Sequence, residues 1–321
     1  MKENIKPLPQ EYKTRPATMA DISIVVELIN FGATHTSVEE KKNAWETPGL
    51  DISKDTHLVF SGDELLVGLL EFWDISEPHV QPTIHLHVHP EKNPLLVGNY
   101  LLSWADKRAK QVLEIAPPDE KVVLLVMADG QDTVKQEILQ ENNYIKERIF
   151  WHMLLEMDAP PPIKELPEGF SIRAHVAGQD DRTMHETMES AFADHWRHVP
   201  IDYDQWSHWN LDEDEFDPDL WFFATQADLI VGGLMAWATF NDEMDTGWIS
   251  DLGVLKDWRG RGIGEALLSH VFRAFYERDT KKVVLLVDTD GETGALHLYE
   301  KVGMKPLDAQ FVYEKVVSPS E

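Results

Sequence analysis

VVLLVDTD at Val283–Asp290 repeats VVLLVMAD at Val122–Asp129. Two further stretches recur in the same order: LLVGL at Leu65–Leu69 returns as LIVGG at Leu229–Gly233, and GNYLLS at Gly98–Ser103 returns as GEALLS at Gly264–Ser269. The three offsets are 161, 164 and 166 residues, and their near-constancy indicates an internal duplication. The chain is therefore predicted to contain two copies of one domain.

The length and the composition agree with two domains. The chain has 321 residues, 43% of them hydrophobic and 11 of them tryptophan, which is enough for two ordinary cores. The proline-rich stretch DAPPPIKELPEG at Asp158–Gly169 lies between the copies and is typical of a short, semi-rigid linker. The expected domains are residues 1–158 and 169–321, joined by a linker at 159–168.

The second copy alternates between strand and helix patterns. Apolar Ile263, Leu267, Val271 and Phe275 recur at helical spacing, and the continuous apolar run 282–287 is typical of a strand buried on both faces. The expected strands are 170–174, 221–226, 229–240, 247–255, 282–287 and a final pair ending at 317; the expected helices are 180–195, 203–211, 263–277 and 293–302. This order predicts an α/β fold, in which each copy is a mixed, mostly antiparallel central sheet flanked by helices.

The charge and the residue content exclude several classes of function. The chain carries 57 acidic and 29 basic residues, and its net charge of −28 disfavours nucleic acid and anionic membranes as partners. Such a surface favours a cationic acceptor such as an amine, although it could equally serve solubility alone. The absence of cysteine excludes disulfides, thiolate metal sites and a cysteine nucleophile. With no apolar run of about 20 residues and no apolar signal core, a cytoplasmic protein is expected.

The most specific local motif is VLKDWRGRGIG at Val254–Gly264, which joins a strand to a helix. Three alternate glycines let the backbone approach a ligand closely, and the following helix N-terminus adds partial positive charge. Arg259 and Arg261 would make a basic spot in an acidic protein. The stretch therefore predicts a phosphate or pyrophosphate site, with a flexible turn as the alternative. It fits neither a dinucleotide fingerprint nor a P-loop.

A second motif, VDTDGETGALHLYEKVGM, follows the next strand at Val287–Met304. Together the two stretches resemble the GNAT family of N-acetyltransferases. The family's acetyl-CoA loop, Arg/Gln-x-x-Gly-x-Gly/Ala, is matched by Arg259, Gly262 and Gly264. Its downstream helix, Ala-x-x-Leu-Tyr-x-x-x-Gly-Phe, is matched by Ala295, Leu298, Tyr299, Gly303 and Met304. The resemblance covers the second copy and implies acetyl-CoA as co-substrate.

The resemblance also implies a role for each matched position. Backbone amides of the loop would hold the pyrophosphate, and Leu252, Gly253 and Val254 would pair with the pantetheine arm and polarise the thioester carbonyl. Tyr299 would protonate the leaving thiolate, although its apolar stripe also fits a plain core tyrosine. Where many relatives have an asparagine, this chain has Gly291 after Asp290. The expected cofactor-binding residues are Leu252, Gly253, Val254, Arg259, Gly260, Arg261, Gly262, Ile263, Gly264 and Asp290.

A general base and an acceptor site are needed as well. The attacking amine must lose a proton, and Asp251, in the strand before the loop, is the best placed candidate; the alternative is a structural strand aspartate. The aromatic residues around the first two helices suit a small amine, with His195, Trp196 and Tyr203 as expected substrate contacts, or they simply pack those helices on the sheet. No His-x-x-x-His or similar spacing predicts a metal site.

The first copy keeps the core pattern but loses the chemistry. At an offset of 166, the loop residues from Arg259 to Gly262 correspond to Asn93, Pro94, Leu95 and Leu96, and only Gly98 survives, opposite Gly264. Tyr299 falls on Leu139, or on Ile138 if the register slips by one. His85, His87 and His89 alternate in a strand, which favours a shared face over a metal site. The first copy is thus predicted to be a degenerate domain.

The sequence as a whole predicts a tandem protein whose C-terminal copy transfers an acetyl or other short acyl group from CoA to a primary amine of a small molecule. Without cysteine for an acyl-enzyme, direct attack in a ternary complex is expected. The alternatives are a non-catalytic CoA-binding or regulatory protein and an inert dimerisation module. A homodimer is a further expectation.

Overall fold

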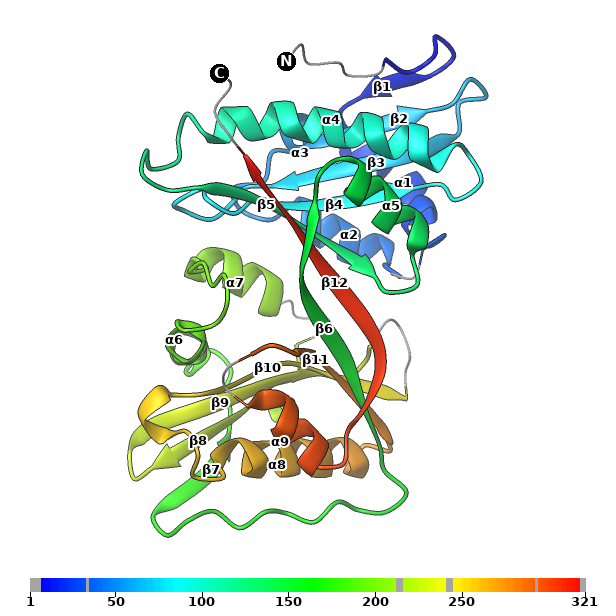
Figure 1. Ribbon diagram of the computed structural model, residues 1–321. Helices are drawn as coiled ribbons and strands as arrows, with labels where there is room; N and C mark the ends of the chain where they lie inside the picture. Colours follow the sequence, from blue (N-terminus) through cyan, green and yellow to red (C-terminus); the bar gives the residue numbers. More distant parts are fainter. Residues whose placement is uncertain (1–6, 33–34, 212–215, 241–244, 292–293, 318–321) are drawn as a thin grey trace. The chain divides into compact units, whose positions relative to one another are not determined.

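A computed structural model describes residues 7–32, 35–211, 216–240, 245–291 and 294–317 of the chain (Figure 1). The chain divides into two compact units. Unit 1 contains the residues up to Arg148 and those from Gln310 on, and unit 2 contains Ile149–Ala309. These boundaries differ from the expected division at the linker, which lies wholly inside unit 2.

The order of elements is nearly the same in the two units. Unit 1 contains β1 (Lys13–Arg15), the 3-10 turn Met19–Asp21, α1 (Ile22–Ile29), α2 (Val38–Trp45), α3 (Ile52–Asp55), β2 (Thr56–Phe60), β3 (Leu66–Trp73), β4 (Thr83–Val88), α4 (Pro94–Val112), β5 (Val122–Asp129) and α5 (Thr133–Glu141), and β6 (Ile145–Glu156) leads out of it. Unit 2 contains β7 (Phe170–Ala174), α6 (Asp181–Phe192), α7 (Tyr203–Asn210), the 3-10 turns Pro218–Leu220 and Lys256–Trp258, β8 (Phe222–Gln226), β9 (Leu229–Trp237), β10 (Thr246–Val254), α8 (Ile263–Glu277), β11 (Lys282–Asp288) and α9 (Ala295–Lys301), and β12 (Lys305–Val317) leads out of it.

Each unit is built on a mixed sheet. The strand order is β1-β2-β3-β4-β5-β12 in unit 1 and β6-β11-β10-β9-β8-β7 in unit 2. Within these orders only β4–β5 and β10–β11 pair in parallel. In unit 2, α6 and α7 lie on one side of the sheet and α8 and α9 on the other (Figure 1). The predicted mixed, mostly antiparallel sheet flanked by helices is confirmed.

Two strands complete sheets that the linker-based division assigns to the other copy. β6, the last strand of the first copy, pairs antiparallel with β11 of unit 2 from Glu156 to Phe150. β12, the last strand of the second copy, pairs antiparallel with β5 of unit 1 from Gln310 to Val317. The C-terminal segment is one strand of 13 residues, so the expectation of a final strand pair is wrong. Because the two strands close equivalent sheets, they are exchanged between the copies.

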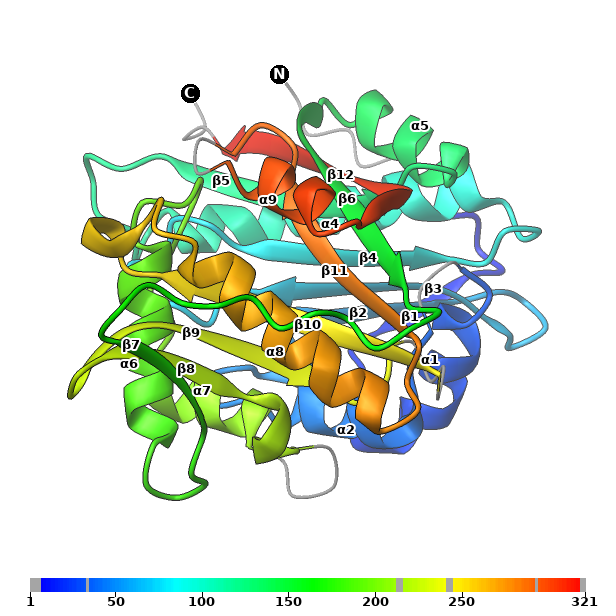
Figure 2. The same ribbon diagram turned by 90° about the horizontal axis from the view of Figure 1, so that it is seen from below.

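The helix α8 shows how local pattern sets packing. Its predicted apolar stripe, Ile263, Leu267, Val271 and Phe275, is buried in the core of unit 2. The ring of Phe275 occupies the place where a Cβ on Gly247 of β10 would lie, so the helix approaches the sheet closely. Figure 2 shows α8 lying along the unit 2 sheet, with residues 158–169 running beside it.

The structure shows a repeated ion pair that the sequence comparison missed. In unit 1, Arg15 donates to both carboxylate oxygens of Asp21, at 2.7 and 2.6 Å. In unit 2, Arg173 makes the same fork with Asp180. Each aspartate is buried, precedes the first α-helix of its unit and accepts a backbone N–H of the turn before that helix. This equivalence is independent support for the duplication.

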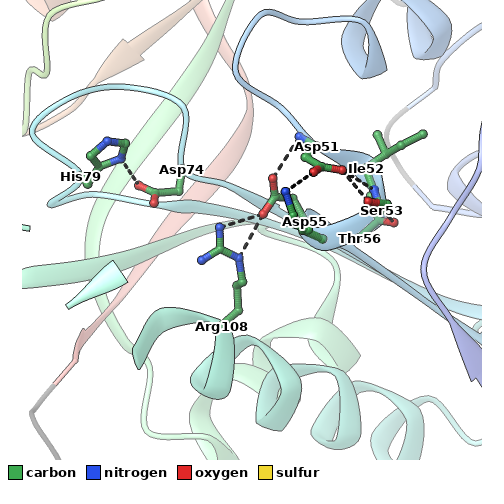
Figure 3. A network of polar contacts seen from close by, with 9 residues as sticks. Asp51, Ile52, Ser53, Asp55, Thr56, Asp74, His79 and Arg108 are labelled. Carbon is green, nitrogen blue, oxygen red and sulfur yellow. Dashed lines mark hydrogen bonds and ion pairs between the residues drawn. The ribbon is translucent and has the colours of Figure 1, made fainter. Parts of the chain in front are cut away.

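Other charged side chains of unit 1 also pair within the unit. Arg108 of α4 donates from Nε and Nη2 to Asp55 at 3.0 and 2.9 Å, and Asp55 accepts the Asp51 N–H (Figure 3). Nearby, His79 Nδ1 lies 3.2 Å from Asp74 Oδ1 (Figure 3). The Arg108–Asp55 pair joins α4 to α3, whereas His79 and Asp74 pair within the segment between β3 and β4. In the described part of the chain, no helix is both long enough and apolar enough to cross a membrane.

Candidate functional site

The central strands of unit 2 part at the place expected for the co-substrate. β10 and β11 pair in parallel from Thr246–Lys282 to Ile249–Leu285, where their register ends. β11 continues against β6 to Asp288, and β10 continues against β9 to Val254. The edge of β10 that faces away from β9 is therefore open along Leu252–Val254. An open strand edge can pair with an extended ligand, as expected for a pantetheine arm.

A β-bulge lies at the same point of β10. The β9–β10 register shifts between Ile249 and Asp251, so Ser250 is an extra residue. A Cβ on Gly247 would meet Phe275 of α8, whereas a Cβ on Gly253 would meet Ala191 and Met188 of α6. Residues six apart in a regular strand share one face, so the bulge has reversed the faces. Asp251 consequently points to the α6 side of the sheet.

Two glycines of the loop have a positive φ. Gly260 and Gly262 have φ of +74° and +81°, and a Cβ on either would meet nothing within 4 Å, so the loop is open on its outer side. Gly262 is the N-cap of α8, whose first backbone N–H groups follow at Ile263. Gly264 has another role: its Cβ would lie 3.1 Å from Leu298 of α9, so it allows close packing of the two helices. The arrangement suits an anion at the start of α8.

The two arginines of the loop differ in their contacts. Arg261 is exposed; it donates to the Asp257 carbonyl at 3.1 Å and lies over the Trp258 ring. Arg259 instead donates two hydrogen bonds to the Asp194 carboxylate, from Nη1 at 2.8 Å and from Nη2 at 2.9 Å. The local positive charge of this loop is therefore provided chiefly by Arg261 and by the helix N-terminus.

Tyr299 and Asp251 affect each other electrostatically. Burial raises the pKa of the Tyr299 phenol, and the Asp251 carboxylate raises it further. Burial also raises the pKa of Asp251, a hydrogen bond with Ser250 lowers it, and Glu189 of α6 raises it. Tyr299 belongs to the buried core of unit 2 as well, so its core and acid roles are compatible. A neutral tyrosine can donate a proton, and a carboxylate with a raised pKa is a stronger base.

Glu189 is a residue of this region that the sequence did not reveal. Its carboxylate lies 3.2 Å from His198 Nε2 and accepts the Ile201 N–H at 3.3 Å. It thereby holds the chain between α6 and α7. No motif marks it, because its neighbours His198 and Ile201 come from the next loop.

The expected acceptor residues differ in their surroundings. His195 and Trp196 are half-buried in the loop after α6, where the His195 ring packs on Phe192. Tyr203 begins α7, stacks on Trp206 at 5.9 Å and has the Arg182 guanidinium 3.9 Å over its ring. These contacts favour a packing role for Tyr203. Asp290 follows β11, and its N–H donates to Asp288 at 3.0 Å, forming a turn.

The end of α9 and the linker line an open cavity of about 1060 Å³ inside unit 2. It begins at Arg261 and Gly262 of the glycine loop and is lined by α8, by Lys301 and by residues 155–167. Glu265 in its wall lies 2.7 Å from Lys301 Nζ and 3.5 Å from Lys164 Nζ.

The predicted last helix, 293–302, is observed as α9; residue 293 lies outside the described residues.

The corresponding place in unit 1 is built differently. The β3–β4 register runs without a bulge from Gly68–Val88 to Trp73–Thr83. The turn into α4 has Asn93 as N-cap and Pro94 in the first turn in place of the glycines. A Cβ on Gly98 would clash with Ile138, as one on Gly264 would crowd Leu298, so Leu139 is the counterpart of Tyr299. Leu139 is fully buried and has no proton to donate.

His85 of β4 and His89, just after this strand, contact other side chains. His85 stacks on Trp73 and lies 3.6 Å from Glu71, which pairs with the buried Lys41. Burial lowers the pKa of His87, and the His89 ring contacts Phe31. Among the residues that the structure describes, no group of three or more histidines and carboxylates could hold a metal ion.

Comparison with known proteins identifies a family domain within unit 2. The model of the acetyltransferase (GNAT) family matches residues 182–304, which include the parted strands, the glycine loop and Tyr299. Residues 182–304 form a GNAT acetyltransferase domain. The prediction of a CoA-dependent N-acetyltransferase with acetyl-CoA as co-substrate is thereby confirmed.

Similar proteins match either most of the chain or about half of it. The mycothiol acetyltransferase of Streptomyces coelicolor is 26% identical over 312 residues, 94% of this chain and 92% of its own. That of Nocardiopsis dassonvillei is 32% identical over 167 residues, 49% of each chain. A solved GCN5-related N-acetyltransferase from Sphaerobacter thermophilus has a TM-score of 0.78, 29% identity and 98% coverage of both chains. A tandem GNAT protein from the clavulanic acid biosynthesis pathway shares the fold, with a TM-score of 0.71 at 14% identity, 97% coverage of this chain and 100% of its own.

Proposed function

We propose that unit 2 of this GNAT protein transfers an acetyl or another short acyl group from CoA to a primary amine of a small molecule. The observation that carries the proposal is the parting of β10 from β11 beside the glycine loop, with Asp251 and Tyr299 nearby. The pantetheine arm lies along the open edge Leu252–Val254. The pyrophosphate lies on the backbone amides from Arg261 to Gly264, and the adenosine end of CoA extends into the cavity that begins at Gly262.

The reaction is a direct attack. The amine nitrogen forms a bond to the thioester carbonyl carbon, and the carbon–sulfur bond breaks. Backbone N–H groups on the open edge of β10 stabilise the negative charge that develops on the carbonyl oxygen. Asp251 accepts the proton that the nitrogen loses, and Tyr299 gives one to the departing sulfur.

The raised pKa values bear on both roles. Tyr299 is protonated at neutral pH, as a tyrosine with the usual pKa of about 10 already is, and burial and Asp251 raise its pKa further, so it enters the reaction with its proton. Asp251 has a raised pKa because it is buried and lies near Glu189. The bulge at Ser250 turns Asp251 toward the α6 side, where the amine would enter.

We further propose that the acceptor binds beside α6 and the loop after it, near His195 and Trp196. Carboxylates at Asp251 and Glu189 favour a cationic amine there. Similar curated proteins are named mycothiol acetyltransferase, so the acceptor of those enzymes is one candidate for this chain. A cytoplasmic location stays a prediction. A homodimer also stays a prediction, and sedimentation tests it.

The test is release of free CoA thiol from acetyl-CoA in the presence of an amine panel: glucosamine, tyramine and spermidine. We expect turnover with at least one amine, and mass spectrometry should show the acetylated product. Binding of acetyl-CoA without turnover of any amine would contradict the proposal and favour a CoA-binding regulator.

A further inference from the structure

The guanidinium of Arg259 is almost completely used by hydrogen bonds within unit 2. Its Nη1 and Nη2 donate to Asp194 at 2.8 and 2.9 Å, its Nη2 also donates to the Ala191 carbonyl at 2.7 Å, and its Nε donates to the Val254 carbonyl at 3.0 Å. Four of the five N–H groups of the side chain thus have protein acceptors. Two of these bonds form the bidentate fork, the strongest geometry for an arginine–carboxylate pair.

The three partners of Arg259 belong to the two halves of the proposed site. Val254 ends the open edge of β10, along which the co-substrate arm would lie. Ala191 is in the last turn of α6 and packs on Gly253. Asp194 begins the loop that carries His195 and Trp196. Arg259 therefore links the strand proposed to bind the co-substrate to the loop proposed to bind the acceptor.

We propose that Arg259 is a positioning residue for the acceptor, acting through Asp194, and that it is not a ligand of the CoA phosphates. The inference rests on the proposed function. A phosphate that recruited Arg259 would have to displace the bidentate pair already formed. Among the described residues, Asp194 would then keep only Lys256, at 3.6 Å, as a counter-ion. Arg261 needs no such exchange, because it is exposed and its guanidinium donates to one carbonyl.

The test compares Arg259→Ala, Asp194→Ala and the double variant. We expect each single variant to raise the KM for the amine about tenfold, equivalent to about 1.4 kcal/mol. The KM of the double variant for the amine should be no higher than that of either single variant, because all three variants remove the same interaction. The affinity for acetyl-CoA, measured by calorimetry, should change less than about threefold. The conservative Arg259→Lys, which cannot make the fork, should resemble Arg259→Ala.

Arg278→Ala is the matched control. Arg278 Nη2 donates to both carboxylate oxygens of Asp217, at 3.4 and 3.1 Å, with side chains of similar exposure, at the opposite end of α8. Its replacement should leave the KM for the amine and the affinity for acetyl-CoA unchanged. If Arg259→Ala weakened acetyl-CoA binding tenfold or more while Asp194→Ala did not, Arg259 would be a phosphate ligand and the inference would be overturned.

A second readout does not depend on turnover. The His195 N–H donates to Phe192 and the His198 N–H to His195. Hydrogen exchange at these amides should become faster in both Arg259→Ala and Asp194→Ala, and not in Arg278→Ala. Unchanged exchange in the first two variants would overturn the inference. A parent protein that binds no acetyl-CoA would instead refute the proposed function, while this exchange experiment would still decide whether Arg259 holds the loop.

Discussion

The Asp251 carboxylate, on strand β10, raises the pKa of the Tyr299 phenol, on helix α9. The two residues lie 48 positions apart in the sequence, and the fold brings them into one electrostatic environment. Asp251 is placed there because the bulge at Ser250 changes the face to which its side chain points. Tyr299 is placed there because Gly264 lets α9 pack closely on α8. The proposed base and the proposed acid are thus positioned by backbone features on either side of the parted strands.

Replacing Tyr299 with phenylalanine removes the proton donor and keeps the ring. We expect kcat to fall by about 10²–10³-fold, the range typical of general acid catalysis, with unchanged affinity for acetyl-CoA. Steady-state kinetics and calorimetry measure the two quantities. Wild-type kcat in Tyr299→Phe would mean that the residue only fills the core.

Asp251 should control the acid limb of the pH profile. As a base it must be deprotonated, so kcat/KM should fall as the pH drops through its pKa, which burial raises above the ordinary aspartate value. Asp251→Asn should lower the rate and abolish this limb. Because a raised pKa means that the folded protein disfavours the charged form, the asparagine variant should be as stable as the parent at pH 7, or more so. A pH profile with the same acid limb in Asp251→Asn would exclude this base.

The repeated arginine forks should stabilise both units. Asp21→Asn and Asp180→Asn should each lower the free energy of unfolding by about 1–3 kcal/mol, because each breaks a charged hydrogen-bond pair at a buried carboxylate. Hydrogen bonding to Arg15 lowers the pKa of Asp21 to about 2. The stabilisation is therefore present above the unfolded-state pKa of about 4 and is lost as the pH falls toward 2. Urea unfolding at pH 7 and pH 2.5 tests this: the deficit of Asp21→Asn should shrink at the lower pH, and an equal deficit at both would refute it.

Much of the fold could be predicted because its signals are local. The stripe of α8, the glycine loop and the duplicated strand segments each lie within a dozen or so consecutive residues. The strand exchange could not be predicted, because nothing in the sequence of β6 or β12 shows which of the two sheets each strand will join. The unit boundaries therefore differ from those suggested by the linker.

The parts of the candidate site that could be predicted also have local signals in the sequence. The loop glycines, Tyr299 and Asp251 stand in or beside motifs, and the structure places them around the parted strands. The contact of Arg259 with Asp194 joins residues 65 positions apart, and Glu189 is held by a loop that follows it. The bulge at Ser250 involves no proline or glycine that would have marked it. Such features depend on tertiary contacts and on register.

The central claim is that one acetyl-CoA binds in unit 2 at the start of α8, and calorimetric titration tests it most directly. Gly262→Asp places a negative charge at the proposed pyrophosphate position, whereas Gly262→Asn tolerates the same positive φ without the charge. Pro94→Asp is the equivalent change in unit 1. We predict one equivalent bound by the parent, by Pro94→Asp and by Gly262→Asn, and none by Gly262→Asp. Two equivalents bound by the parent would contradict the degenerate first copy, and unchanged binding in Gly262→Asp would contradict the site itself.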